Sequence, residues 1–259
     1  MTPLFLSLIA GAALSASADT EPVVAQREMS TDRPDSTESP TTVPAGMVQI
    51  EAELAAWGRD DDTRSWTFGE FNFKYGVTDN VDVQLVIPVW QRIREGDAVA
   101  DGFGDITVRT KINLWGNDGG DTAFGIMPFI TLPTGADGIT ADGVEGGFIL
   151  PFSMDLPGPF GLGLMTELDA VYDDDRDDYD LEWLNSVVLG IELTEKVGAF
   201  FELVSISSFA SGADWEGYGN AGFTWQPLPN RLQFDTGVRL GLNEAAEDLV
   251  LFVGCSTRF

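Results

Sequence analysis

From Gly46 to the end of the chain, hydrophobic and polar residues alternate with a period of two in runs of roughly 10 to 13 residues. This period places successive side chains on opposite faces of a β-strand. The runs are rich in Val, Ile, Phe, Trp and Thr, which favour strands. The pattern predicts about twelve antiparallel strands, at residues 46–58, 65–75, 81–92, 104–115, 122–132, 145–155, 160–172, 181–193, 196–206, 216–226, 230–240 and 248–258.

The connections between these runs alternate in length. Short connections lie at residues 76–80, 116–121, 157–159, 194–195 and 227–229. Longer ones lie at 59–64, 93–103, 133–144, 173–180, 207–215 and 241–247. Short periplasmic turns that alternate with longer outer loops are typical of an outer-membrane barrel. We therefore expect an all-β fold, an antiparallel transmembrane β-barrel with both termini on the periplasmic side.

The alternation also assigns the two faces of each strand. In the run 65–75, three aromatic residues oppose three polar ones: Phe71, Phe73 and Tyr75 against Glu70, Asn72 and Lys74. Apolar side chains can meet lipid, whereas charged ones need a wet lumen. A soluble β-sandwich alternates too, with its apolar face inward. Tryptophans near the ends of runs, such as Trp57, Trp66, Trp115 and Trp225, suit interfacial girdles and favour the barrel.

The inward parity collects charged residues of both signs. The predicted lumen-lining residues are Glu51, Glu53, Glu70, Lys74, Arg109, Lys111, Glu167, Asp169, Glu182, Asp235 and Arg239. Facing ladders of opposite charge set the electric field in a pore. The same residues can instead pair with one another and stabilise a filled barrel, and the sequence leaves both interpretations open.

The first 45 residues differ from the rest. Residues 1–18 hold an apolar run and end in Ala16-Ser17-Ala18, which predicts a signal peptide cleaved after Ala18, although its start carries no Lys or Arg. Residues 19–45 form a polar leader in which Pro34, Pro40 and Pro44 argue against regular structure. This leader either threads through the periplasm or folds into the lumen as a partial plug. Residues 46–259 form the barrel.

Composition narrows the chemistry. A formal charge of -28 argues against nucleic acid as a partner. The chain has no histidine, the usual general base, so we expect no enzyme activity, no metal and no cofactor. The single cysteine, Cys255, is interpreted as a small packing residue. Acidic runs at 60–62 and 173–175 lack the spacing of an EF-hand, and whether they bind Ca²⁺ is left open.

The last run ends at Phe259, with Leu249, Leu251 and Val253 on the same face as that ring. An aromatic residue that closes an alternating strand resembles the C-terminal signature by which the barrel-assembly machinery recognises outer-membrane proteins. We therefore assign Phe259 as an assembly signal, and expect this machinery and outer-membrane lipid as partners.

Several motifs point to a family. The segment Asp32-Arg33-Pro34-Asp35, followed by Val43-Pro44-Ala45-Gly46, resembles the start of the outer-membrane transporter family associated with the meta-pathway of phenol degradation. Residues 76–80 resemble its first periplasmic turn, and Gly102-Phe103-Gly104-Asp105 resembles its strand entry. The resemblance implies a channel that admits aromatic or other small hydrophobic compounds, and it carries over no binding residues.

The leading hypothesis is thus an outer-membrane channel or transporter for small, aromatic or hydrophobic molecules, working by passive or ligand-selective diffusion, with an unidentified solute. Two alternatives stay open. One is a filled structural outer-membrane barrel without transport. The other, more remote, is a secreted soluble β-sandwich that binds a ligand.

Overall fold

The structure, a computed structural model, describes residues 27–174 and 176–259. The predicted signal peptide and the first residues of the leader lie outside the described residues. No helix in the described part of the chain is long and apolar enough to cross a membrane. The strands are β1 (Val48–Asp60), β2 (Thr63–Thr78), β3 (Val81–Glu95), β4 (Ala98–Gly102), β5 (Ile106–Trp115), β6 (Thr122–Leu132), β7 (Glu145–Asp155), β8 (Phe160–Asp173), β9 (Asp178–Thr194), β10 (Val197–Ser208), β11 (Glu216–Leu228), β12 (Leu232–Gly241) and β13 (Leu249–Arg258).

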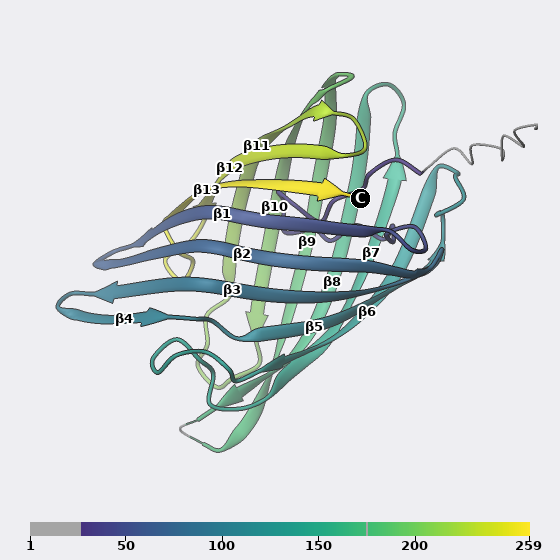
Figure 1. Cartoon of the computed structure of the whole chain (residues 1–259). Coiled ribbons are helices and arrows are strands. Elements are labelled where there is room, and N and C mark those ends of the chain that lie inside the picture. The colour runs from purple at the N-terminus through teal and green to yellow at the C-terminus, as the bar shows by residue number, and fades with distance from the viewer. Residues whose placement is uncertain (1–26, 175) are drawn as a thin grey trace, which may run out of the picture.

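Twelve of these strands close into an antiparallel barrel (Figure 1). Each strand pairs with the next along the barrel, and β13 pairs with β1 to complete the ring. The short strand β4 lies outside the ring and pairs only with the last residues of β3, from Gln91 to Glu95. Closure leaves no long unpaired edge, which a membrane-spanning sheet requires.

The twelve predicted strands are confirmed, but two of the predicted longer connections are not. The first, residues 59–64, contracts to the two-residue turn Asp61-Asp62 between β1 and β2. Residues 93–103 are predicted to be a loop, but β3 continues to Glu95 and turns into β4. The turn is a two-residue hairpin in which Gly96 adopts a left-handed φ of 55°. Gly96 and Asp97 are typical turn residues, and the strand pattern on either side of them is too short to stand out. The hairpin therefore extends the barrel wall beyond its rim (Figure 1).

The faces of the wall exclude the soluble sandwich. Large apolar side chains are exposed on the outside, among them Phe201, Leu203 and Phe223. Charged and polar side chains are buried inside, among them Glu51, Lys74, Asp82, Lys111, Glu202 and Asp235. This arrangement reverses that of a water-soluble protein and suits lipid outside and a polar lumen inside.

One irregularity in β1 keeps both faces consistent. Its register against β13 shifts between Glu53 and Ala55, a β-bulge at Leu54. Without the extra residue, strict alternation would put Trp57 on the same face as Glu51 and Glu53. With it, Trp57 pairs with Leu251, which is exposed on the outer face. The bulge thus allows carboxylates in the lumen and an aromatic ring on the outer surface in one strand.

Candidate functional site: the leader in the lumen

The described part of the leader, residues 27–45, passes through the lumen (Figure 1). Its centre is Asp32, whose carboxylate is 7 % exposed and pairs with two lysines of the wall. Lys111 Nζ from β5 lies 2.6 Å from Asp32 Oδ1, and Lys74 Nζ from β2 pairs with Oδ2. Burial alone raises the pKa of this carboxyl, but the charges of Lys111 and Lys74 bring that pKa well below its ordinary value. Asp32 is therefore ionised and holds the leader to the wall.

Glu51 of β1 binds the leader backbone directly. Its Oε2 accepts hydrogen bonds from the backbone N–H of Asp32 (3.0 Å) and of Arg33 (3.1 Å). Its Oε1 pairs with Lys74 and accepts a further bond from Gln49 Nε2 (2.8 Å). Every oxygen of this buried carboxylate thus has a partner, as a charge in a low-dielectric site requires.

Arg33 extends the network across the β1–β13 junction, where the barrel closes, to β12. Its guanidinium donates to Asp235 of β12 at 2.9 Å and lies 3.5 Å from Glu53 of β1. The same group sits over the ring of Phe252, 5.8 Å from its centroid. Arg33 is therefore fixed between three strands.

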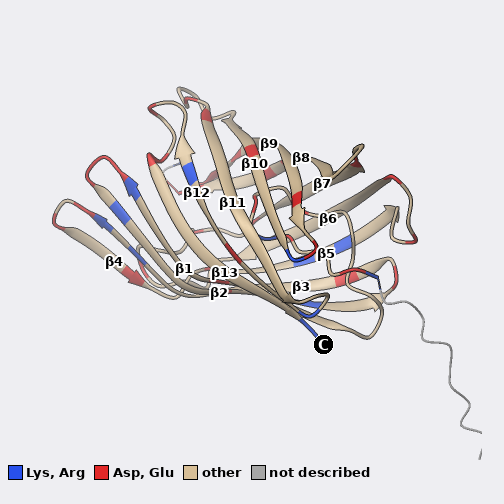
Figure 2. Ribbon diagram, turned by 90° about the horizontal axis from the view of Figure 1, so that it is seen from above, with Lys and Arg blue, Asp and Glu red and all other residues tan. Residues whose placement is uncertain are grey.

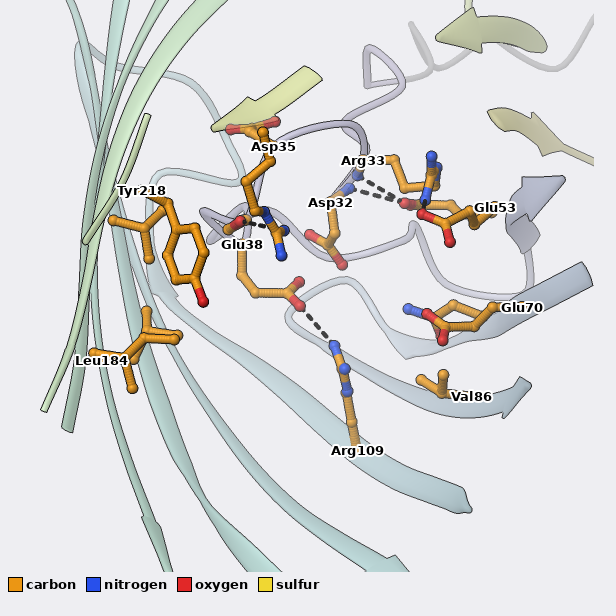
Figure 3. A pocket seen from close by; sticks show the side chains of 16 residues that line it. Asp32, Arg33, Asp35, Glu38, Glu53, Glu70, Val86, Arg109, Leu184 and Tyr218 are labelled. Atoms are coloured by element: carbon orange, nitrogen blue, oxygen red, sulfur yellow. Dashed lines mark hydrogen bonds and ion pairs between the residues drawn. The ribbon is translucent and has the colours of Figure 1, made fainter. Parts of the chain in front are cut away.

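Two further wall residues, Glu202 and Arg109, hold the next part of the leader, and Figure 3 shows the contact of Arg109 with Glu38. Glu202 of β10 accepts bonds from the backbone N–H of Ser36 (2.9 Å) and of Thr37 (2.8 Å). Arg109 of β5 donates to Glu38 at 2.6 Å. Burial and the charge of Asp32 raise the pKa of Glu38 to about 7, against the lowering effect of Arg109.

The structure places the predicted lumen residues in three groups. Glu51, Glu53, Glu70, Arg109 and Arg239 line a cavity of about 380 Å³. Lys74, Lys111 and Asp235 are buried against the leader. Glu167 and Asp169 lie in β8, with Asp169 paired to Glu182 of β9. These last three carboxylates make no ion pair with a basic residue in the described part of the chain.

Arg239 is different from the other arginines of the lumen. It donates to Ser36 Oγ at 3.1 Å and lies 5.6 Å from the ring centroid of Tyr218. Of the leader motif, Arg33, Pro34 and Asp35 also line a second cavity, of about 640 Å³, below the leader. The motif Asp32-Arg33-Pro34-Asp35 therefore borders open space, together with its neighbours Glu28, Thr31, Ser36 and Glu38.

Sequence reasoning did not single out several polar residues that bind the leader. Asp82 accepts from the backbone N–H of Val43 (2.9 Å), and Asn113 Nδ2 donates to the carbonyl of Pro40 (2.9 Å). Both have the inward parity of their strands, so the signal was present. That they bind the leader depends on the path of this irregular segment through the lumen.

The C-terminal residue, Phe259, takes part in the pairing of β1 with the end of the chain that closes the barrel. The backbone N–H of Phe259 donates to the carbonyl of Val48 (2.9 Å), and the N–H of Val48 donates back (3.2 Å). The ring of Phe259 is 69 % exposed. Cys255 is half-buried and lies opposite Ala52 of β1. Among the described residues no group of carboxylates and thiols has the arrangement of a metal site.

Solved outer-membrane proteins share this architecture. An outer membrane channel from Pseudomonas putida F1 is similar with a TM-score of 0.66 at 12 % identity, over 85 % of this chain and 97 % of that one. The NanC porin is similar with a TM-score of 0.57 at 8 % identity, over 81 % of this chain and 98 % of that one. At such identities the likeness shows a common fold.

Comparison with curated proteins found no match. Comparison with family models confirms the relationship that the leader motif predicts. Residues 31–259 match the model of the family described as putative MetA-pathway of phenol degradation, and because this match spans most of the chain, the protein belongs to that family.

Proposed function

We propose that the protein is an outer-membrane channel through which small solutes diffuse, exported by a signal peptide that is cleaved after Ala18. The observation that supports this proposal is the open space left in the lumen on both sides of the leader, about 380 Å³ toward the long loops and about 640 Å³ toward the short turns. Cavities of this size hold small organic molecules.

The lining of the first cavity suits a solute with a polar and an apolar part. One side of this cavity carries charged residues of the leader and of β1, β2 and β5. Leu184 and Tyr218 lie on the other side (Figure 3). Val204 and Ile206 pack with them, and Arg239 lies over the Tyr218 ring, so this side is mainly apolar and aromatic. A small aromatic or otherwise amphipathic compound can contact both sides at once.

A filled structural barrel is the competing function, and the buried ion pairs of Asp32 favour it because they fix the leader across the lumen. Conductance in planar bilayers separates the two. We expect discrete steps of ion conductance from the folded protein and none from protein-free bilayers. Liposome swelling with matched aromatic and sugar solutes then ranks the solutes. A folded protein that inserts, shown by heat-modifiable gel mobility, and yet conducts nothing would establish the filled barrel.

A further inference from the structure

The two cavities of the lumen are separated by a short piece of the leader. The cavity of about 380 Å³ is called the outer cavity here, and that of about 640 Å³ the inner cavity. They share two lining residues, Arg33 and Asp35. The inner cavity reaches the short turn between β7 and β8, which contributes Leu156, Gly158 and Pro159 to its lining. The leader turn from Arg33 to Asp35 therefore separates the outer cavity from the inner cavity, which lies near the opposite end of the barrel.

Glycines keep the inner cavity open on one side. Gly161 of β8 and Gly190 of β9 lie opposite each other in the strand pairing, and both line the cavity. A Cβ atom at Gly161 would meet no other heavy atom within 4 Å, and one at Gly190 would meet only the carbonyl oxygen of Gly161, at 3.8 Å. By contrast, a Cβ at the neighbouring Gly163 would clash with Val188 at 2.6 Å. Packing explains Gly163, whereas Gly161 and Gly190 border empty space.

The junction between the cavities is held by Arg33. Its guanidinium is tied to Asp235 and Glu53 and covers Phe252, while its Nε is buried and has no hydrogen-bond partner among the described residues. The side chain thus occupies the space between the leader and the wall without satisfying all its donors. A group in this position limits the width of any passage from one cavity to the other.

From these observations, and given the channel function proposed above, we propose that solutes cross the lumen along one route. They enter the outer cavity, pass the leader turn Arg33–Asp35, and leave through the inner cavity along Gly161 and Gly190. Arg33 is the side chain that sets the width of this route. The leader is then the selectivity element of the channel and stays in place while solutes pass.

Cysteine modification tests the inner half of the route after folding is complete. Gly161→Cys is made in a Cys255→Ala background, inserted into a planar bilayer, and treated with a neutral benzyl methanethiosulfonate. The added ring projects into the inner cavity, so conductance falls by roughly half or more. The matched control is Gly219→Cys in the same background. Gly219 pairs with Leu203 and Leu240, both exposed on the outer face, so its modification leaves conductance unchanged.

The outcomes of this experiment separate two failures. Unmodified protein that does not conduct overturns the channel function, and the route with it. Unmodified protein that conducts, while labelled Gly161→Cys conducts equally well, overturns the route alone. Failure of the reagent to label Gly161→Cys, judged by mass spectrometry against labelled Gly219→Cys, also overturns it because the route requires open access.

A second variant tests the junction. Arg33→Ala removes the guanidinium between the cavities, and we expect conductance to rise by roughly twofold or more. Arg59→Ala is the control because Arg59 lies at the outer end of β1, is 46 % exposed and pairs loosely with Asp248 at 3.6 Å. Conductance of Arg33→Ala at or below that of Arg59→Ala would show that Arg33 does not limit the route.

Discussion

The two sides of the lumen meet the leader in different ways. The docked wall, formed by Glu51, Lys74, Lys111 and Asp235, binds the leader through buried charges that all have partners in it or beside it. The open wall, formed by Gly161, Gly190, Glu167, Asp169 and Glu182, offers glycines facing a cavity and carboxylates without an ion pair among the described residues. Strands β8 and β9 contact the leader through neutral atoms, such as Ser186 Oγ and Met165 Sδ.

The two walls together allow one fold to combine a fixed plug with a passage. Charge pairs buried in the docked wall are costly to break, because a charge left without its partner in a low-dielectric site is strongly unfavourable. The open wall imposes no such constraint, so the space beside it stays free. Figure 2 shows basic residues both within the barrel and on the projecting strand ends, while acidic residues are spread along the loops. The docked wall thus holds the leader rigidly, and the open wall leaves free space in the same lumen.

Releasing the leader from the docked wall should have the largest effect. Asp32→Ala removes the carboxylate that forms an ion pair with Lys111 and deprives Lys74 of one of its two ion-pair partners. Removing one partner of a buried ion pair costs about 3–5 kcal/mol. We expect the leader to become susceptible to a protease of broad specificity at least ~100-fold faster, since 1.4 kcal/mol is a factor of ten. Mass spectrometry of timed digests measures this rate. Asp62→Ala in an exposed loop is the control, and equal protection in both variants would contradict the docking role of Asp32.

The charge preference of the pore should also differ in its dependence on the two walls. The channel is expected to prefer cations or neutral solutes over anions, because the lumen holds more carboxylates than basic residues. Carboxylates of the open wall form no ion pair within the described part of the chain, so they should carry most of this preference. We expect the combined variant Glu167→Gln, Asp169→Asn, Glu182→Gln to lower the cation-to-anion permeability ratio by roughly twofold or more.

Reversal potentials across a gradient of dilute salt measure this ratio, since screening weakens the effect at about 1 M. The matched comparison is Glu51→Gln with Glu53→Gln, on the docked wall. These two carboxylates are neutralised by Lys74 and Arg33, so their removal should change the ratio less. A larger effect from Glu51 and Glu53, or anion selectivity in the unmodified protein, would place the selectivity on the docked wall.

Local pattern was sufficient to predict most of the fold. Alternation in β2 and β5 correctly put Lys74 and Lys111 inside, because a strand fixes the direction of each side chain by parity alone. The bulge at Leu54 and the β3–β4 hairpin were not predicted, since each depends on one or two residues and on the register of a partner strand.

The candidate site was harder to predict for a different physical reason. Asp32 was recognised as part of a motif, but its ion pairs depend on the path of an irregular segment, and such a segment has no period from which a path follows. Likewise, Gly161 and Gly190 are 29 positions apart and become neighbours only through the β8–β9 register. Sequence therefore predicted which residues face the lumen, and left open which of them meet the leader.

Glycine substitutions test the two walls by their effect on stability. Gly254 of β13 lies beside the docked wall, and a Cβ there would come within 2.5 Å of the Arg33 guanidinium and 2.6 Å of the Ala52 carbonyl oxygen. Gly254→Ala should destabilise the protein by about 1–3 kcal/mol, the usual cost of overpacking. Gly161→Ala meets no such obstacle and should stabilise it by about 0.5–1 kcal/mol. Denaturant unfolding in micelles gives both values, and equal midpoints would remove the distinction between the walls.

The smallest expected effect concerns Asp35, which borders both cavities. Burial and the nearby charge of Glu202 raise the pKa of Asp35 well above its ordinary value. Below the pKa of about 3.9 that the released leader would have, Asp35 is protonated in both states and contributes nothing to the pH dependence. As pH rises above that value, the docked leader retains a proton that the released leader loses, so docking weakens. Asp35→Asn removes the contribution of Asp35 to this dependence, while that of Glu38 is common to both proteins, and the variant leader should be digested roughly two- to fivefold more slowly than the wild-type leader at pH 8, with little difference at pH 4. Digestion rates are corrected with an unfolded substrate at each pH, and Asp62→Asn serves as the exposed control. Equal digestion of the wild-type and Asp35→Asn leaders at pH 8 would show that the cavities hydrate Asp35 enough to ionise it in place, which would put a charged carboxylate on the proposed route.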